Sequence, residues 1–467
     1  MRPWTNCAAT HVRDPEAVDT AIIGAGIAGL SVGYYLALRH GVTRVAIIDA
    51  GVPMGMTSAQ SGENYRNWWP HRVMTAFTDH AIDLLEEIAC ASGNRIHMTR
   101  RGYVLATRRR APADLLAELH RGYGDEGARR IRVHEGSSSG YQRVVSSDWQ
   151  TAPDGVDVLI GRTLIETELQ CLAPDIETVV HIRRAGDISG QQLGQWMLER
   201  MRDAGVRLIR ASVAGIEAGA RFTLCLDGEE GLQSLHADRV VNAAGPFFGN
   251  VAAMLGEELP VQCVFQQKIA FEDREGALPR TMPFAIDLDG QQLAWTEEER
   301  EILASDSSGA ALLRPMPGGI HRRPEGGDAG RWIKLGWAYN AQPSDPADEP
   351  PLNPHFPDVV LRGASRLNPA LGRYLGRLPR GARHYGGYYT MTPENWPLIG
   401  PMRTPGAFMA GALSGYGTMS ATAAGALCAA WMTGAAPPAY AANFTLRRYD
   451  DAELMGELLG SDNKGVL

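Results

Sequence analysis

Residues 20–30 read Thr20-Ala21-Ile22-Ile23-Gly24-Ala25-Gly26-Ile27-Ala28-Gly29-Leu30, and residues 45–49 read Val45-Ala46-Ile47-Ile48-Asp49. The first run predicts a strand, a glycine turn and a helix, and the second predicts a strand that ends in an acid. The glycines allow a tight turn and close approach of the backbone to a pyrophosphate at the helix N-terminus. A carboxylate at position 49 can accept hydrogen bonds from the adenosine ribose. The cofactor contacts expected here are Gly24, Gly26, Ile27, Ala28, Gly29 and Asp49.

Composition sets limits on the class of protein. The chain has 467 residues, long enough for two domains, and 53 acidic against 45 basic residues give a net charge of −8. This balance argues against a nucleic-acid partner, because no basic stripe offsets phosphate repulsion. No run reaches the ~20 apolar residues that span a bilayer, so we expect no membrane partner. The first 18 residues are polar, unlike a signal peptide, and indicate a cytoplasmic protein.

Six cysteines are scattered along the chain. They form no CxxC pair and have no histidine at zinc-site spacing, so no metal is expected. We interpret them as reduced thiols, in keeping with a cytoplasmic protein.

The order of strand-like and helix-like segments predicts an α/β protein with two discontinuous domains. A Rossmann-like dinucleotide-binding domain is assembled from separate segments, and a mostly antiparallel α+β substrate domain is inserted between them. The expected boundaries are an extension over 1–18, the dinucleotide domain over 19–100, 180–260 and 386–440, the substrate domain over 101–179 and 261–385, and a tail over 441–467.

A second glycine-rich run lies near the end of the chain. Residues 409–417 end a strand and open a helix expected over 420–432. Glycines there allow the backbone to approach a flat ring, and the helix N-terminus carries about half a positive charge. Aimed at a flavin, that field would stabilise the reduced anionic ring. The alternative is a helix that packs closely on the sheet and contacts no cofactor.

Five motifs occur in order: GAGIAG (24–29) with Asp49, VVNAAGP (240–246), KLGW (334–337), YTMTPEN (389–395) and SGYG (414–417). On these motifs the chain, over roughly residues 19–434, resembles the FAD-dependent amine and amino-acid oxidoreductases of the D-amino-acid oxidase superfamily. The nearest likeness is to the monomeric sarcosine oxidase branch. The resemblance implies FAD as cofactor, with further contacts from Ser58, Ser61, Gly62, Val213, Ala244, Gly245, Gly387, Gly411, Gly415, Tyr416, Gly417 and Thr418.

Lys334 is the most specific catalytic candidate that the resemblance implies. In the sarcosine oxidase branch the matching lysine lies over the flavin and promotes reaction with oxygen, because a fixed cation stabilises superoxide as it forms. The alternative is a surface lysine on a strand, since alternation could turn its side chain outward.

The chain departs from that branch at Gly387, at Met419 and at Trp68-Trp69, where the branch has a further basic residue while Arg66 keeps a basic group nearby. Gly387 stands where covalent members have the flavin-attaching cysteine, so we expect FAD to be bound non-covalently. Met419 stands where the branch has a lysine that grips the substrate carboxylate, and sarcosine is therefore expected to be a poor substrate.

Substrate-pocket candidates are aromatic or basic: Arg66, Trp68, Trp69, Tyr385, Tyr388 and Tyr389. Tryptophan and tyrosine can form cation–π walls for an amine, although the two tryptophans could equally fasten the loop over 51–72 to the core. His384 could act as a base, or could be a structural histidine. The catalytic candidates are Lys334, Arg66, Tyr389 and His384.

The preferred function is an oxidase. Hydride leaves the carbon next to an amine for FAD, an imine forms, and O2 is reduced to H2O2. Two alternatives stay open: a dehydrogenase of the same fold that passes electrons to a quinone or carrier, acting on an amine or a 2-hydroxy acid, and a non-catalytic flavin-binding partner protein. The expected partners are a small amine or amino acid and O2, in a monomer or homodimer.

Overall fold

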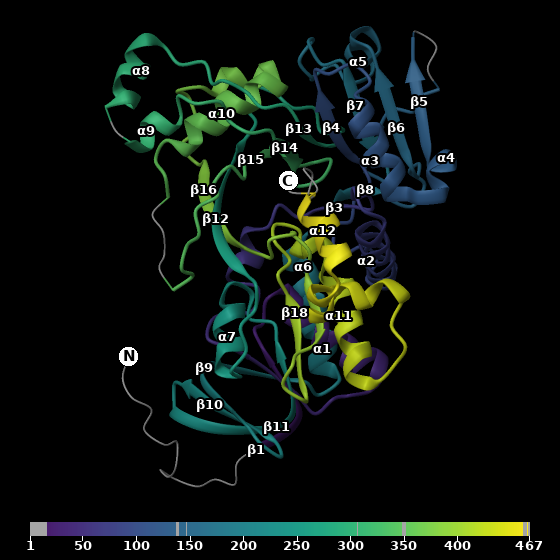
Figure 1. Ribbon diagram of the computed structural model, residues 1–467. Helices are drawn as coiled ribbons and strands as arrows, with labels where there is room; N and C mark the ends of the chain where they lie inside the picture. Colours follow the sequence, from purple (N-terminus) through teal and green to yellow (C-terminus); the bar gives the residue numbers. More distant parts are fainter. Residues whose placement is uncertain are drawn as a thin grey trace.

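Two large β-sheets make up most of the protein in the computed structural model (Figure 1). The structure describes residues 16–136, 140–145, 147–305, 307–347, 352–460 and 465. Most of the expected N-terminal extension lies outside the described residues, and residues 16–18 differ from the expectation because they already belong to the first strand.

The first sheet has seven strands in the order β1-β2-β9-β10-β11-β18-β17, and β1 also pairs with β11. Its strands are β1 (Glu16–Ile23), β2 (Val45–Asp49), β9 (Arg207–Ala218), β10 (Phe222–Gly228), β11 (Gly231–Asn242), β17 (Leu398–Pro401) and β18 (Ala407–Gly411). Parallel β1 lies between β2 and β11, as in Rossmann folds. The run of buried apolar residues in β2 suits a strand covered on both faces. The expected α/β class is confirmed.

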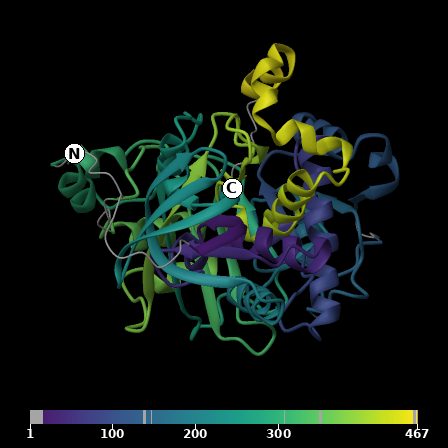
Figure 2. The same cartoon turned by 90° about the horizontal axis from the view of Figure 1, so that it is seen from below.

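Four long helices pack together beside this sheet. They are α1 (Ile27–His40), α2 (Arg72–Ala91), α6 (Gly190–Asp203) and α11 (Gly417–Thr433). Helices α1 and α11 come from opposite ends of the sequence and lie side by side, purple against yellow (Figure 2). This pairing brings both glycine-rich runs to one region.

The second sheet has nine strands in the order β16-β12-β15-β14-β13-β4-β7-β6-β5. Its strands are β4 (Tyr103–Thr107), β5 (Ile131–Glu135), β6 (Val156–Ile160), β7 (Thr178–Ile182), β12 (Gln262–Glu272), β13 (Phe284–Asp287), β14 (Ile320–Glu325), β15 (Trp332–Gly336) and β16 (Arg383–Met391). Its pairs are antiparallel except β4–β13 and β5–β6, so the expected mostly antiparallel sheet is present. Two expected boundaries differ, because β7 and β16 extend this sheet beyond residues 179 and 385.

A separate two-stranded sheet is formed by β3 (Asn64–Arg66), which pairs antiparallel with β8 (Ala185–Asp187). The remaining described helices are α3 (Ala113–Tyr123), α4 (Gly127–Arg130), α5 (Arg162–Glu168), α7 (Phe248–Met254), α8 (Glu297–Ala304), α9 (Ser307–Ala311) and α10 (Phe356–Leu367).

The C-terminal segment departs from the expected tail. Two 3-10 turns (Ala439–Phe444 and Leu446–Asp450) and α12 (Ala452–Gly460) follow α11. The fully buried Arg448 donates to Glu394 of the YTMTPEN run at 2.5 Å. The folded structure therefore continues at least to residue 460, because a buried ion pair fixes this segment to the dinucleotide side.

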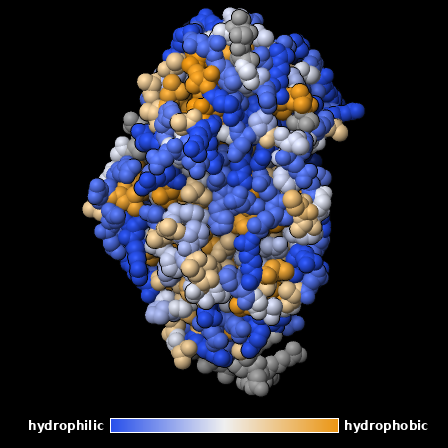
Figure 3. Space-filling model, turned by 90° about the vertical axis from the view of Figure 1, so that its right-hand side faces the viewer, coloured by the Kyte–Doolittle hydropathy of each residue, from blue (hydrophilic) through white to orange (hydrophobic). Residues whose placement is uncertain are grey.

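The face shown in Figure 3 is mostly hydrophilic, with apolar residues in separate patches. Among the described residues, no helix is both long enough and apolar enough to span a bilayer.

Candidate functional site

The glycine turn between β1 and α1 is built as the sequence predicts. Gly24 has a φ of 108°, and a Cβ there would lie 2.3 Å from the carbonyl oxygen of Ala243, so a larger residue does not fit. Asp49 accepts hydrogen bonds from the backbone N–H groups of Ala25 at 2.7 Å and Gly51 at 2.8 Å. The acid at the end of β2 thus holds the turn itself, while its contact with a ribose remains a prediction.

A cavity begins at this turn and runs toward the second sheet. It is lined by residues 26–28, 57–58, 60–62, 243, 245–246, 268, 387–390, 410–415 and 417–418. Segments from the front, middle and end of the chain therefore meet around one space.

Many of the predicted cofactor contacts line this cavity. They are Gly26, Ile27, Ala28, Ser58, Ser61, Gly62, Gly245, Gly387, Gly411, Gly415, Gly417 and Thr418, together with the catalytic candidate Tyr389. Six predicted contacts do not line it: Gly24, Gly29, Asp49, Val213, Ala244 and Tyr416. Tyr416 is a structural residue, since its hydroxyl donates to the Asn395 carbonyl at 2.8 Å and its ring packs edge-on against Trp69.

The cavity wall between β18 and α11 has an unusual backbone. Ala412 and Ser414 have positive φ values of 54° and 44°, which cost energy for residues other than glycine. A Cβ on Gly415 would lie 2.5 Å from the Tyr389 ring, so only glycine fits between that ring and the cavity. The wall leads into the N-terminus of α11, where Thr418 donates to Ser61 Oγ at 2.7 Å. The positive helix end therefore faces the cavity, as expected.

Lys268 lines the cavity, and the sequence interpretation missed it. Its ammonium lies 3.4 Å from the Tyr389 hydroxyl and 3.5 Å from the Gln60 carbonyl oxygen. The side chain is buried on β12, and in the described part of the chain no carboxylate lies within 4.0 Å of Nζ. The alternation of β12 could have indicated that Lys268 is buried, because it lies on the same face of the strand as the buried residues Val264 and Gln266.

Lys334, the expected flavin lysine, does not line the cavity. Its ammonium lies 3.1 Å from Glu325 and 3.4 Å from Glu63, and it donates to the Ser61 carbonyl at 3.3 Å. This is a correction to the sequence expectation. The physical reason is register: Lys334 lies opposite Arg323 on β14, and both face a cluster of acids.

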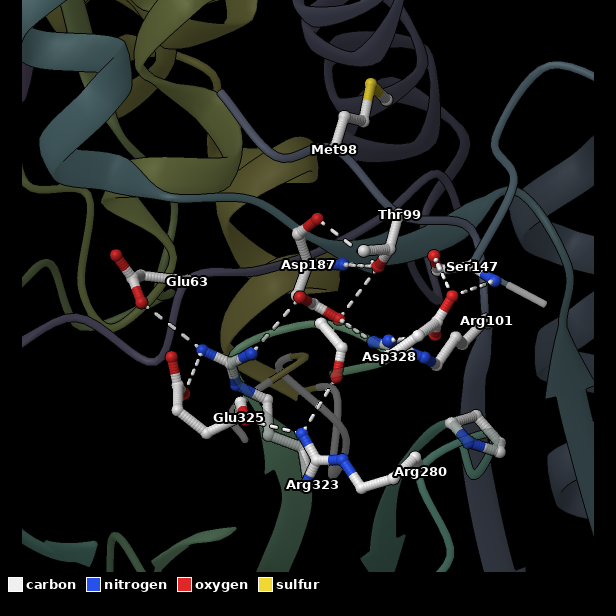
Figure 4. A network of polar contacts seen from close by, with 12 residues as sticks. Glu63, Met98, Thr99, Arg101, Ser147, Asp187, Arg280, Arg323, Glu325 and Asp328 are labelled. Carbon is white, nitrogen blue, oxygen red and sulfur yellow. Dashed lines mark hydrogen bonds and ion pairs between the residues drawn. The ribbon is translucent and has the colours of Figure 1, made fainter. Parts of the chain in front are cut away.

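That cluster joins Glu63, just before β3, to β8 and to β14 of the nine-stranded sheet (Figure 4). The Arg323 guanidinium contacts Glu325 at 2.6 Å, Glu63 at 3.2 Å and Asp187 at 3.3 Å, and Arg101 pairs with Asp187 at 3.2 Å. Burial by itself would raise the pKa of Glu325, but the charges of Arg323 and Lys334 outweigh it and lower that pKa. The cluster is thus charge-balanced, and the cation of Lys334 is neutralised within it.

Arg66 is buried without an acidic partner. Its guanidinium carbon lies 4.8 Å from the ring centres of Trp69 and Tyr103 and 5.9 Å from that of Trp68. Nη2 donates to the Gly465 carbonyl at 3.4 Å, Nε has no partner, and no carboxylate in the described residues forms an ion pair with it. Burial lowers the pKa of Arg66.

Within the described residues, three further buried polar atoms beside Arg66 have no partner: Trp68 Nε1, Trp69 Nε1 and Tyr103 Oη. Burial raises the pKa of Tyr103, the Arg66 charge opposes this rise, and Tyr389 adds to it. Arg66 also donates from its backbone to Met419 Sδ, next to the cavity residue Thr418. Buried donors without acceptors are costly, and an anion would satisfy them.

His384 and Tyr385 lie outside the cavity lining. His384 Nε2 lies 2.8 Å from Gln267 Oε1, its ring stacks on Phe356, and burial lowers its pKa. The proposed role of His384 as a base is therefore not supported. Burial raises the pKa of Tyr385 to about 12. Of the expected aromatic residues, Tyr388 and Tyr389 reach the cavity, whereas Trp68 and Trp69 surround Arg66.

The sequence was compared with protein-family models and with curated proteins, and the structure with solved structures. A family model described as FAD dependent oxidoreductase (DAO) matches residues 19–431. A comparison with curated protein sequences gave no match.

The solved structures are similar over nearly the whole chain. L-proline dehydrogenase from P. horikoshii is 16% identical with a TM-score of 0.71, covering 94% of this chain and 99% of its own. Glycine oxidase from Geobacillus kaustophilus is 16% identical with a TM-score of 0.68, covering 93% and 99%. L-amino acid deaminase from Proteus myxofaciens, in complex with anthranilate, is 16% identical with a TM-score of 0.63, covering 95% and 97%. At these identities the likeness establishes the fold.

Proposed function

Because the chain belongs to the DAO family of FAD-dependent oxidoreductases, we propose that it oxidises an amino acid, or a secondary amine that carries a carboxylate, and passes the electrons to oxygen. The substrate loses two electrons and two hydrogens, one from the carbon next to nitrogen and one from nitrogen, and becomes an imine. Oxygen gains two electrons and two protons and becomes H2O2.

The residues around the cavity fit FAD, which when bound supplies the acceptor for the substrate hydride. The glycine turn and the N-terminus of α1 suit its pyrophosphate. Gly411, Gly415 and Gly417 line the cavity without side chains, which allows close approach of a flat ring. The N-terminus of α11 supplies a positive field at the other side of the same cavity. Gly387 lines the cavity without a thiol, which favours non-covalent attachment.

Arg66 is the observation that carries the proposal. Arg66 is a buried guanidinium that pairs with no carboxylate of the described residues, and the N–H and O–H groups around it have no partner there either, so it is a site suited to an anion. A substrate carboxylate can accept two parallel hydrogen bonds from it, and the surrounding rings exclude water. This grip orients the carbon next to nitrogen toward the cavity, on the side of Tyr103 and Tyr389.

Lys268 supports oxygen as the electron acceptor. Among the described residues, the partners of its ammonium are a phenol and a carbonyl, and none of them is an acid that would neutralise its positive charge. A fixed, desolvated cation stabilises negative charge as it develops on oxygen. Lys334 does not fill this role in the proposal, because two carboxylates already hold its ammonium.

The test begins with anaerobic bleaching of the purified holoprotein. A panel pairs each amino acid with the amine that lacks its carboxylate. It includes sarcosine, which we expect to be a poor substrate because Met419 stands where the sarcosine oxidase branch has a lysine that grips the substrate carboxylate. Amino acids should bleach the flavin and the matched amines should fail.

Admitting oxygen then tests the acceptor. Rapid return of the yellow colour with one H2O2 per turnover supports an oxidase. Slow return in air with fast return on adding a quinone would assign a dehydrogenase, and bleaching by no member of the panel would refute the catalytic proposal.

A further inference from the structure

Glu63 has a backbone conformation that normally selects glycine. Its φ is 60°, in the left-handed region, where a residue with a Cβ is strained. The residues directly before it, 60–62, line the cavity, whereas Glu63 itself does not. A glutamate that keeps this conformation beside the cavity points to a role for its side chain.

The carboxylate of Glu63 joins three elements outside its own loop. One oxygen accepts the backbone N–H of Gly190, the first residue of α6, at 2.8 Å. The other accepts a hydrogen bond from Arg323 on β14 at 3.2 Å (Figure 4), and the ammonium of Lys334 on β15 lies 3.4 Å from it. The positive N-terminal end of α6 also favours a negative charge at this point. The carboxylate therefore fixes residue 63 to a helix and to two strands of the nine-stranded sheet.

The same glutamate is tied to the cavity wall through Ser61. Its backbone N–H donates to Ser61 Oγ at 3.0 Å, and that oxygen also accepts from Thr418, the second residue of α11, at 2.7 Å. Lys334, which pairs with Glu63, donates to the Ser61 carbonyl at 3.3 Å. Ser61 and Thr418 both line the cavity. Anchoring residue 63 thus anchors the cavity loop (residues 57–62) and the start of α11.

The first residues of α6 and α11 pack together at this point. A Cβ added to Gly190 would lie 3.2 Å from the Thr418 methyl carbon and 3.5 Å from Glu63 Oε1. Movement of the carboxylate would therefore be felt at both helix ends, because little free space separates them.

Glu325 provides a comparison within the same cluster. Its carboxylate lies 2.6 Å from Arg323 Nη2 and 3.1 Å from Lys334 Nζ, so it neutralises the same two cations. Among the described residues, however, its side chain has no hydrogen bond or ion pair with the cavity loop or with Gly190. The two acids thus match in charge and differ in their contact with the cavity wall.

We propose that Glu63 is a positioning residue for FAD: its carboxylate holds the cavity loop and the start of α11 in the arrangement that binds the cofactor. This role requires FAD in the cavity and is independent of the proposed substrate and electron acceptor. Loss of the carboxylate should loosen Ser61 and Thr418 while both large sheets stay paired, so FAD binding should weaken more than the fold.

The test compares Glu63→Gly, Glu63→Gln and Glu325→Gln as FAD-loaded proteins. Glycine adopts a φ of 60° without strain, so the first variant removes the side chain and spares the backbone. Glutamine can still accept from Gly190 but has no charge for Arg323 and Lys334. Glu325→Gln is the matched control, because it removes the same charge beside the same cations. Serial dilution with detection of free flavin by fluorescence gives the Kd, and visible circular dichroism reports the surroundings of the bound flavin.

We expect FAD to bind about ten- to a hundredfold more weakly to Glu63→Gly and about three- to tenfold more weakly to Glu63→Gln, each with an altered visible spectrum. Glu325→Gln should stay within about threefold of the unchanged protein and keep its spectrum.

Equal weakening in the two glutamine variants would overturn the proposal, since the charge balance of the cluster would then explain the effect. A lower melting temperature of Glu63→Gly with unchanged FAD affinity would also overturn it, because Glu63 would then serve the fold alone. If Glu63→Gly does not fold, the comparison of the two glutamine variants decides.

Discussion

Replacing Lys268 with methionine separates the two halves of the catalytic cycle. Methionine keeps the length and the apolar stem of the side chain and removes the charge. Reduction by substrate depends on how the substrate is held, so it should proceed at nearly the normal rate. Reoxidation by oxygen depends on a positive charge beside the cavity, so it should slow.

The structure sets the size of this effect. Nζ of Lys268 lies 5.4 Å from the centre of the Tyr389 ring, which lines the cavity. A unit negative charge at a similar distance gains about 3 kcal/mol at an effective dielectric constant of about 20. That energy corresponds to a rate change on the order of a hundredfold. Removal of one preorganised donor gives a similar range in other active sites.

Stopped-flow spectroscopy measures each half-reaction. The protein is first reduced anaerobically by the best amino acid of the panel and then mixed with oxygenated buffer. Lys334→Met is the matched control, because it removes a neighbouring lysine whose charge Glu63 and Glu325 neutralise. It should lower the melting temperature, since it leaves the acidic cluster in excess, and change reoxidation by less than about threefold.

Two results would refute this reasoning. If Lys268→Met reoxidises at the normal rate, the cavity charge has no part in the reaction with oxygen. If the reoxidation rate of Lys334→Met instead falls about a hundredfold, the motif resemblance identified the right lysine. The ion pairs with Glu63 and Glu325 then do not prevent its charge from acting on oxygen.

Three other predictions follow from the same geometry. Acid precipitation should release all the flavin into the supernatant, because Gly387 offers no thiol; colour in the pellet would contradict this. Asp49→Ala removes acceptors worth ~1.5–3 kcal/mol and frees the backbone N–H of Ala25, so the protein should purify largely without FAD; full occupancy, measured by absorbance, would show that another group holds the ribose. Arg448→Met leaves Glu394 buried without its cation and should lower the free energy of unfolding by ~3–5 kcal/mol in urea titrations; a loss under about 1 kcal/mol would mean that the pair is solvated.

The sequence by itself determined the nucleotide side of the protein. The glycine turn, the helix that follows it and the acid at position 49 are local features: each depends on sterics and hydrogen bonding within a few residues. For the same reason residues 409–417 were enough to predict the glycine-rich entry to α11. The absence of a thiol at position 387 follows from the identity of that single residue, a glycine.

Only the tertiary structure decided which charges reach the cavity. Lys268 and Lys334 both lie on strands, each next to at least one apolar residue, and the local pattern does not show which ammonium reaches the cavity. Their roles differ because strand register places Lys334 beside Glu63 and Glu325, while Lys268 lies beside Tyr389. The same holds for Arg66 and Gly465, whose meeting depends on how the whole chain folds back on itself. Contacts across hundreds of residues are set by packing of the complete molecule, which local pattern does not encode.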